Sequence, residues 1–271
     1  MYIERCGGEK RMQTIIKRCF KNLAGRRAVI LLLLLFGGAF LISALYFLIR
    51  GKAQSIALSL LFLLLLLITP PIEQMLRLRI PPLGYGLLLF LMLGALLGSC
   101  YNFYFRISFW DTMLHGLSGF LFACIGYSVC KLMFSNSRGG GIFPYLLVGV
   151  LFSLSIALLW ELFEAGATRI LAVDMQEDTL LTSIKSFYLS GTHDYATQLT
   201  DIHETVIRYG NGQTLRLAGY LDLGLIDTLE DMAICFFGNL GFLLLFPLDR
   251  LLGGRLLPLL LPHCRADTAG K

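Results

Sequence analysis

Long apolar runs alternate with short polar stretches along this chain of 271 residues. A bilayer core of about 30 Å is crossed by roughly 20 apolar residues in a helix, so such runs predict transmembrane helices. Five runs qualify, and a sixth starts with acids. The second is short, so we expect it either to tilt little or to extend by a turn. The six runs are Ala28–Ile49, Ser55–Thr69, Leu83–Cys100, Trp110–Leu132, Phe143–Phe163 and Ile226–Pro247. We therefore expect an all-α membrane protein of about six transmembrane helices.

The stretches between these runs set the expected organisation: a tail at 1–27, five helices within 28–165, a polar segment at 166–225, the sixth helix at 226–247 and a second tail at 248–271. In the last tail, Leu251–Pro262 is too short to span and contains two prolines, so we expect it at the membrane interface. Apolar spacing predicts a short helix over Asp178–Tyr188 in the polar segment. Two β-rich runs around Asn211-Gly212 predict a hairpin over 205–217 with a two-residue turn, an irregular loop being the alternative.

The positions of the charges predict the orientation. If the N-terminus is cytoplasmic and the chain crosses six times, 16 of the 23 lysines and arginines lie inside and 13 of the 18 acids lie outside. This bias predicts cytoplasmic N- and C-termini and an extracytoplasmic 166–225 segment. The basic first tail has the spacing of an amphipathic helix on an anionic leaflet, and a solvated tail is the alternative.

Composition narrows the class of protein. The chain is 56% hydrophobic and 15% charged, whereas soluble domains are about 25% charged. This excludes a disordered chain, a secreted disulfide scaffold and an ordinary cytosolic enzyme. The 7 cysteines are odd in number and lack metal-ligand spacing, so we interpret them as free thiols. The first apolar run is too long for a cleaved signal peptide, and no nucleic-acid-binding module is present.

Charged residues gather near the ends of three expected helices. Placing charge inside a membrane costs several kcal/mol, so such residues indicate function. Each of the fourth, fifth and sixth helices carries a pair at helical spacing, and alternating helix direction brings all three pairs to the outer level. The pairs are Asp111 with His115, Glu161 with Glu164, and Asp227 with Asp231. We expect a polar pocket open to the exterior, with Asn239 at its floor.

These side chains suggest a divalent cation. Asp111 and Asp227 lie in first turns, where the helix dipole alone favours a carboxylate. That explanation fails for Glu161 and Glu164, which lie near a helix C-terminus. A carboxylate-rich site with one imidazole suits Mg²⁺, Mn²⁺ or Ca²⁺, and also Zn²⁺ or Fe²⁺. The alternative is a metal-free hydrogen-bond network. The expected ligands are Glu161, Glu164, Asp227, Asp231 and His115.

A short acidic stretch follows Glu164 and is a candidate lid over the pocket. It contains Asp174, Gln176 and Asp178, and an ordinary helix N-cap at Asp178 is the alternative. His193 and His203 are further candidate ligands, although loop histidines are usually solvated. The Gly94–Gly98 spacing is typical of close helix packing.

Four motifs together carry a family resemblance: Trp110-Asp111-x3-His115, Trp160-Glu161-x2-Glu164, Asp227-Thr228-x2-Asp231-Met232 and Asn239-x-Gly241. Over roughly residues 80–247 the sequence resembles the YjdF-like family of bacterial inner-membrane proteins and, more remotely, VanZ-like proteins. The resemblance implies a multi-pass protein of the bacterial plasma membrane whose biochemical role is unestablished. One VanZ-like member is associated with glycopeptide-antibiotic resistance, but the long 166–225 segment departs from that pattern.

Three functional hypotheses follow. The first is a membrane enzyme of the cell envelope that acts on a lipid or lipid-linked envelope precursor. Its base would be His115 or a glutamate, with a bound cation as Lewis acid. The catalytic set would be Asp111, His115, Glu161, Glu164, Asp227 and Asp231. The second is a binding, accessory or ion-coupled protein that uses the same pocket. The third is a structural membrane subunit.

Overall fold

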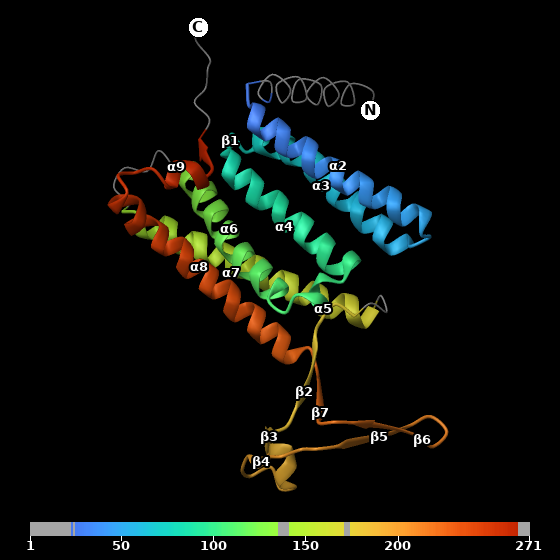
Figure 1. Cartoon of the computed structure of the whole chain (residues 1–271). Helices are drawn as coiled ribbons and strands as arrows, with labels where there is room; N and C mark the ends of the chain where they lie inside the picture. Colours follow the sequence, from blue (N-terminus) through green and yellow to red (C-terminus); the bar gives the residue numbers. More distant parts are fainter. Residues whose placement is uncertain (1–22, 24, 135–140, 171–173, 265–271) are drawn as a thin grey trace, which may run out of the picture. The chain divides into compact units, whose positions relative to one another are not determined.

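The computed structural model describes residues 23, 25–134, 141–170 and 174–264. Six of its helices are long and apolar enough to cross a membrane, which confirms the predicted fold class (Figure 1). They are α2 (Arg27–Ile49), α3 (Ala53–Met75), α4 (Pro82–Tyr101), α6 (Trp110–Met133), α7 (Phe143–Ile170) and α8 (Leu225–Leu251). The expected extension of the second run is present, because α3 continues through Pro70 and Pro71. The predicted amphipathic helix of the first tail lies outside the described residues.

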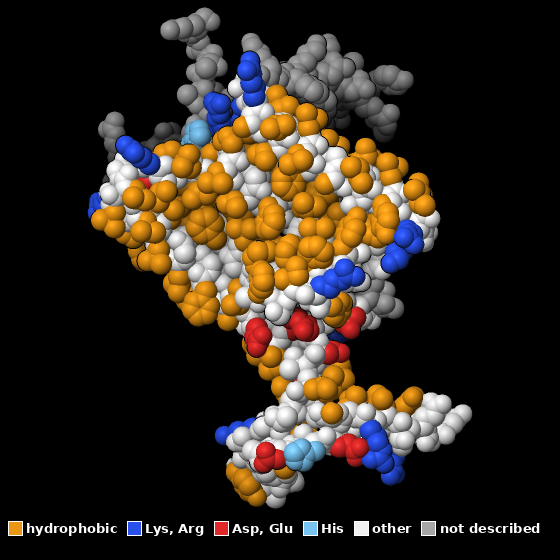
Figure 2. All heavy atoms as spheres, viewed as in Figure 1, with side chains coloured by type: hydrophobic (Ala, Val, Ile, Leu, Met, Phe, Trp, Pro, Cys, Tyr) orange, Lys and Arg blue, Asp and Glu red, His pale blue; other side chains and the backbone are white. Residues whose placement is uncertain are grey.

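The exposed surfaces of the long helices are apolar. On the face shown in Figure 2, hydrophobic side chains cover the helices almost continuously. Leu31 and Leu34 of α2 are each 68% exposed, and Leu67 of α3 and Leu159 of α7 are 60% and 61% exposed. Such broad apolar exposure would be unfavourable in water and is what lipid-facing helices require.

The chain divides into two compact units. The first contains residues 1–157 and 234–271, and the second contains residues 158–233. Both divisions fall inside a helix, since α7 and α8 each continue without a break past the division. Short elements complete the first unit: α5 (Phe103–Arg106), α9 (Leu257–Leu260) and the antiparallel pair of β1 (Leu78–Arg79) with β8 (His263–Cys264).

Helices α2, α3 and α4 share one apolar core in the first unit, in which the rings of Phe40 and Phe62 lie 5.9 Å apart. The Trp110 indole donates a hydrogen bond of 3.0 Å to the carbonyl of Gly94 and so joins α6 to α4. Gly94 also faces Leu114, and Gly98 faces Tyr104, so both glycines of the predicted motif serve close packing.

Glycines bring α6, α7 and α8 into backbone contact. A side chain at Gly238 of α8 would collide with the carbonyl of Gly116 on α6, and one at Gly149 of α7 with the carbonyl of Ala123. The Ser153 hydroxyl on α7 also donates to the carbonyl of Gly119 at 2.8 Å. Farther along these helices Tyr127 packs between Phe242 and Phe246. The crossings are therefore fixed by main-chain contacts, which leaves little freedom to the side chains that they position.

A buried ion pair joins the start of α2 to the end of α3. The Arg26 guanidinium donates to both carboxylate oxygens of Glu73, at 2.7 and 2.9 Å. Glu73 also accepts from the backbone N–H of Ile80 at 2.7 Å and from the Tyr85 hydroxyl at 3.0 Å. This buried carboxylate therefore accepts four hydrogen bonds from three donor groups, which offset its desolvation.

The second unit contains short antiparallel strand pairs in place of the predicted helix over Asp178–Tyr188. That prediction was wrong. Its residues form β2 (Asp178–Leu181), β3 (Ile184–Ser186) and the start of the 3₁₀ turn η1 (Phe187–Ser190). β2 pairs with β7 (Tyr220–Leu223), and β3 pairs with β4 (Thr197–Leu199). Neither partner strand is adjacent in the sequence, so the local apolar spacing did not reveal the pairs.

The predicted hairpin over 205–217 is confirmed, but its turn differs. Strand β5 (Thr205–Tyr209) pairs with β6 (Gln213–Leu217), and the last pair is Tyr209 with Gln213. The loop therefore has three residues, 210–212, where two were expected. Gly210 and Gly212 have φ values of +53° and +82°, conformations that glycine adopts without strain.

Candidate functional site

The first turns of α6 hold the predicted acid and histidine. Asp111 is half-buried, and His115, one turn later on the same face, is buried. Nε2 of His115 lies 3.6 Å from Oδ1 of Asp111. This separation is longer than an ordinary hydrogen bond, and it suits two groups that share a cation.

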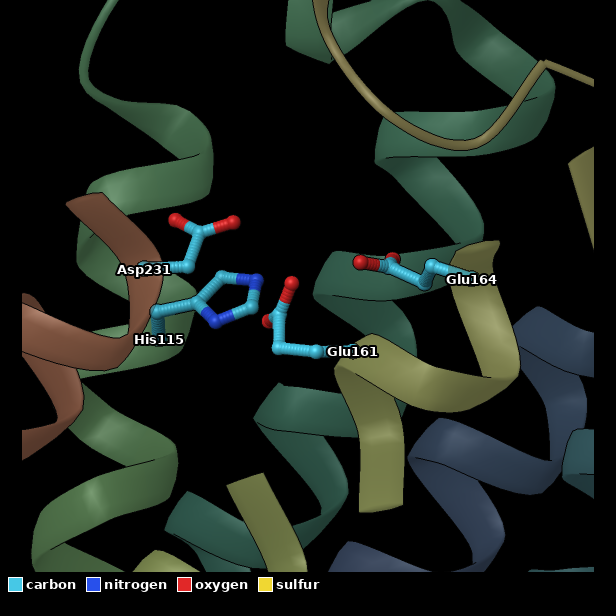
Figure 3. Close-up of side chains that lie close together, drawn as sticks. All are labelled: His115, Glu161, Glu164 and Asp231. Carbon is cyan, nitrogen blue, oxygen red and sulfur yellow. The ribbon is translucent and has the colours of Figure 1, made fainter. Parts of the chain in front are cut away.

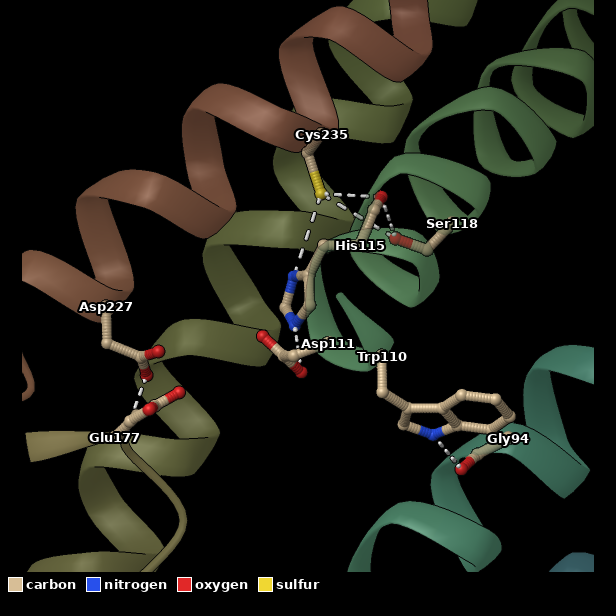
Figure 4. A network of polar contacts seen from close by, with 8 residues as sticks. All are labelled: Gly94, Trp110, Asp111, His115, Ser118, Glu177, Asp227 and Cys235. Atoms are coloured by element: carbon tan, nitrogen blue, oxygen red, sulfur yellow. Dashed lines mark hydrogen bonds and ion pairs between the residues drawn. The ribbon is translucent and has the colours of Figure 1, made fainter. Parts of the chain in front are cut away.

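The other side of the imidazole faces a cysteine from α8. Sγ of Cys235 donates to the carbonyl oxygen of His115 at 3.3 Å and lies 4.0 Å from Nδ1 of the ring (Figure 4). The Ser118 hydroxyl donates to the same carbonyl at 2.8 Å and lies 3.6 Å from the sulfur. Cys235 is a free thiol, as are Cys100, Cys124 and Cys130, in agreement with the interpretation from sequence.

Buried polar residues follow one stripe along each of α7 and α8. On α7 the stripe runs through Ser153, Ala157, Glu161 and Glu164, all buried. On α8 the half-buried Asp227 begins a stripe that continues at intervals of four residues through the buried positions Asp231, Cys235 and Asn239. Because the acids share these stripes with packing residues, they turn away from lipid.

Three of the buried acids come together. Glu161, Glu164 and Asp231 each offer an oxygen within 4.8 Å of the others (Figure 3). Asp227 also offers an oxygen within 4.8 Å of Asp231. The exposed fractions of Glu161, Glu164 and Asp231 are 3%, 8% and 5%. Carboxylates this close and this buried require protonation, hydrogen-bond donors or a cation to offset their mutual repulsion.

The expected lid segment, residues 174–178, is hydrogen-bonded to the start of α8. The Gln176 amide donates to the Thr228 hydroxyl at 2.9 Å and to the carbonyl of Gly224 at 3.3 Å. The next backbone N–H, of Glu177, donates to Asp227 Oδ2 at 3.0 Å (Figure 4). Gly224 has a φ of +77°, and a side chain there would collide with Gln176. Gln176 is therefore the lid candidate that makes contact beside the acids.

Asp174 and Asp178, the other two lid candidates, are both exposed. Asp178 begins strand β2, so the alternative interpretation of this residue as a helix N-cap was wrong. Partial desolvation, followed by the neighbouring carboxylates of Asp174 and Asp222, raises the pKa of Asp178.

The two loop histidine candidates do not join the acids in the groups of potential metal ligands found among the described residues. His193 packs its ring against Tyr188 at 5.2 Å. Glu204, the neighbour of His203, pairs with Arg216 at 2.8 Å on the surface, and this hydrogen bond raises the pKa of Arg216. His193 and Glu204 therefore make local contacts within the 166–225 segment.

Asn239 is 1% exposed, and its amide nitrogen donates to the carbonyl of Cys235 at 2.9 Å. Its Oδ1 has no hydrogen-bond partner in the described part of the chain. The polar stripe of α8 ends close by, because the next buried positions are Phe242 and Leu245.

Sequence reasoning missed the contribution of Cys235, Ser118 and Thr228. A cysteine or serine among apolar residues is usually a small packing residue, so composition gave no signal. Spacing places Cys235 one turn from Asp231 on the same face, but it does not reveal the contact of its sulfur with His115.

Six apolar helices that carry a cluster of buried carboxylates define an integral, multi-pass membrane protein. The chain belongs to a family of predicted membrane proteins, DUF2238, whose model matches residues 29–249. This membership is consistent with the YjdF-like resemblance of its motifs. No curated protein and no solved structure matches the chain.

Proposed function

We propose that this membrane protein holds a divalent cation on Glu161, Glu164 and Asp231, with His115 as a fourth ligand, and uses it on a lipid or lipid-linked substrate. The observation that carries the proposal is the closeness of the three buried carboxylates, whose oxygens fall within 4.8 Å of one another. Three carboxylates and an imidazole suit Mg²⁺, Mn²⁺, Zn²⁺ or Fe²⁺, whereas Ca²⁺ favours oxygen ligands alone.

The continuity of α7 and α8 supports the inclusion of His115. Asp231 lies one turn before Cys235, whose sulfur contacts the imidazole. Glu164 lies three turns after Ser153 on the same stripe of α7, and Ser153 bonds to Gly119, one turn after His115. Each acid thus continues a helix that already contacts α6 beside the histidine.

Electrostatics also support a bound cation. Hydrogen-bond donors are the other way to stabilise a buried acid in this chain, as at Glu73, which has an arginine, a tyrosine and a backbone N–H as donors. Glu161 and Glu164 lie near the C-terminus of α7, where the helix dipole disfavours negative charge. A divalent ion offsets this repulsion and binds both glutamates at once.

Such a cation would polarise a phosphate or carbonyl oxygen of the substrate. Asp111, which is not among the proposed ligands, would supply a base beside it and would orient the imidazole. Asp227 offers an oxygen near Asp231 and completes the proposed catalytic set. In this proposal the segment with Asp174, Gln176 and Asp178 forms one wall of the site, and Gln176 holds that wall on α8.

For orientation, we propose cytoplasmic termini in a bacterial plasma membrane, with the site toward the exterior. The distribution of lysine and arginine supports this orientation. Single cysteines at Asp194 and at Arg77, in a background without native cysteines, test it. A membrane-impermeant maleimide should label intact cells at Asp194→Cys only, and labelling at Arg77→Cys only would reverse the orientation.

Ion-coupled transport is a weaker candidate than enzymatic action or binding. A transporter requires a polar path across the bilayer. Beyond Asn239 the described residues of α6 and α8 pack Tyr127, Phe242 and Phe246 together, with ring centroids 5.2 to 6.0 Å apart. This aromatic packing counts against a continuous path.

Metal analysis of the purified protein tests the cation site. Wild-type protein should retain about one divalent ion per chain after gel filtration, or take up Mn²⁺ or Zn²⁺ in equilibrium dialysis. Glu161→Gln and Asp231→Asn should each weaken uptake at least tenfold. The control Glu204→Gln removes an exposed acid elsewhere and should leave uptake unchanged. Equal uptake by all four proteins would contradict the site.

Lipid profiles of cells test the enzymatic part. Cells that lack the protein should accumulate one lipid or lipid-linked precursor. Wild-type protein should reverse this accumulation, whereas His115→Gln, at equal membrane abundance, should not. Full reversal by His115→Gln would contradict the enzymatic role and would leave a binding or structural role as the explanation.

A further inference from the structure

Two basic side chains face each other across the short strand pair of the first unit. Strand β1 lies in the turn between α3 and α4 (Figure 1), and β8 belongs to the C-terminal part of the chain. Arg79 of β1 is directly opposite His263 of β8, and both side chains are exposed. Residues in this relationship have Cβ atoms about 5 Å apart, so the two basic groups share one small area of the surface.

Arg77 adds a second arginine to the same turn. Its φ is +52°, in the left-handed region, directly after the C-cap residue of α3. That position at the end of a helix favours glycine, because a side chain makes the conformation costly. Arg77 is exposed, so packing does not explain the arginine, whereas Leu78 between the two arginines is buried. A backbone outlier with an exposed charged side chain points to a role for that charge.

The acid nearest to this turn does not neutralise it. The Glu73 carboxylate accepts from the backbone N–H of Ile80, next to Arg79, but Arg26 donates to both of its oxygens. The charge of Glu73 is therefore already balanced. None of the ion pairs found within the described ranges of the chain includes Arg77 or a basic residue of β1 or β8. The turn thus carries an excess of positive charge.

Exposed apolar side chains flank the same turn along the chain. Met75, the last residue of α3, and Leu83, in the first turn of α4, are both exposed. Because α3 and α4 are long and apolar enough to cross a membrane, the turn that joins them lies where the hydrocarbon core meets the headgroups. Basic groups at this depth attract anionic lipids. A phospholipid uses both the basic groups and the apolar surface, whereas a free phosphate ion uses the basic groups alone.

We propose that Arg77, Arg79 and His263 bind the phosphate of an anionic phospholipid whose acyl chains lie along the exposed apolar ends of α3 and α4. Each guanidinium donates charge-assisted hydrogen bonds to phosphate oxygens, and the imidazole donates one more. Phosphatidylglycerol fits this site better than phosphatidylcholine, whose ammonium group the arginines repel. Because β1 and β8 belong to distant parts of the chain, the bound lipid fastens the C-terminal segment to the α3–α4 turn.

Native mass spectrometry of the full-length protein in detergent tests the site. Wild-type protein should retain phosphatidylglycerol in preference to phosphatidylcholine with the same acyl chains. Arg77→Gln and Arg79→Gln should each weaken retention about tenfold, and His263→Ala should weaken it less, because its hydrogen bond is uncharged. Equal retention of the two lipids by wild-type protein, or unchanged retention in the three variants, would overturn the proposal.

Arg255→Gln is the matched control, since it removes an exposed arginine from the same C-terminal segment outside the strand pair. It should retain phosphatidylglycerol as wild type does. Equal losses in Arg255→Gln and Arg79→Gln would show a diffuse attraction of positive charge and would overturn the site. Arg79→Lys keeps the charge and should retain more lipid than Arg79→Gln. Equal losses in those two variants would indicate a packing defect and would also overturn it.

Thermal unfolding separates a lipid from a free anion. Phosphatidylglycerol should raise the melting temperature of wild-type protein and leave that of Arg79→Gln almost unchanged. Without added lipid the two proteins should melt alike, which shows that the variant is folded. Inorganic phosphate lacks acyl chains and should give little shift. A shift with inorganic phosphate as large as with the lipid would assign the basic groups to a free anion and would overturn the proposal.

Discussion

The side-chain amide of Gln176 donates a hydrogen bond of 2.9 Å to the hydroxyl of Thr228. The bond connects the polar segment that follows α7 to the first turn of α8, next to Asp227. Gly224 accepts a second bond from the same amide, and its missing side chain gives Gln176 its space. The start of α8 and the segment that packs on it therefore form one hydrogen-bonded unit beside the acids.

Gln176→Ala should loosen this attachment. Loss of the amide bonds should cost about 1 kcal/mol and increase hydrogen exchange of residues 174–178. Gln198→Ala removes an exposed amide bond to Ser183 and is the control, with no effect on that segment. Equal exchange in the two variants would show that the Gln176 bonds contribute nothing.

Gly238→Ala should destabilise the crossing of α6 and α8. An added methyl group would overlap the carbonyl of Gly116, so the helices must separate, at a cost of about 1–3 kcal/mol. Gly38→Ala, in α2, has no atom within 4 Å of the added methyl group and should be neutral or slightly stabilising. Thermal unfolding in detergent measures both. A neutral Gly238→Ala would contradict the close crossing.

Arg26→Met should leave the buried Glu73 without its charged partner. Removal of one partner of a buried pair costs about 3–5 kcal/mol. Arg27→Met removes the same charge from the exposed neighbouring position and should have little effect. The double variant Arg26→Met, Glu73→Met should recover most of the loss. Membrane abundance and thermal unfolding measure the series, and a stable Arg26→Met protein would argue against the pair.

A bound cation should stabilise the protein by mass action. At a concentration of one hundred times Kd, a ligand that binds only the folded state adds about 2.7 kcal/mol. Mn²⁺ or Zn²⁺ should therefore raise the melting temperature of wild-type protein, and a chelator should reverse the shift. Glu161→Gln, whose binding should be at least tenfold weaker, should show at most about half of this stabilisation, whereas Glu204→Gln should respond as wild type does.

Asp178 should make the β2–β7 pair sensitive to pH. Its pKa is raised in the folded protein, so folding favours the protonated carboxyl. The stabilisation is present below the ordinary pKa of 3.8 and is lost as the pH rises through the raised value. Asp178→Asn should remove this dependence and slow protease cleavage near β2 at neutral pH. Cleavage that is equally dependent on pH in both proteins would contradict the assignment.

The sequence predicted the features that depend on neighbours along the chain. Apolar runs predicted the six helices, and i,i+3 or i,i+4 spacing predicted that Glu161 and Glu164, or Asp227 and Asp231, share a face. Features that depend on distant partners were not predicted. Asp178 of β2 pairs with Leu223 of β7, and Glu73 meets Arg26 across 47 residues. Spacing placed Cys235 on the stripe of Asp231, but a cysteine among apolar residues does not reveal its partner, His115.

The Arg26–Glu73 ion pair also has a consequence for biosynthesis. Arg26 precedes α2, and its partner leaves the ribosome only after α2 and most of α3 have been made. Until then the guanidinium must stay solvated at the membrane surface. The bond therefore forms only when the first two helices have inserted side by side, and it marks the completion of the first helical hairpin during synthesis.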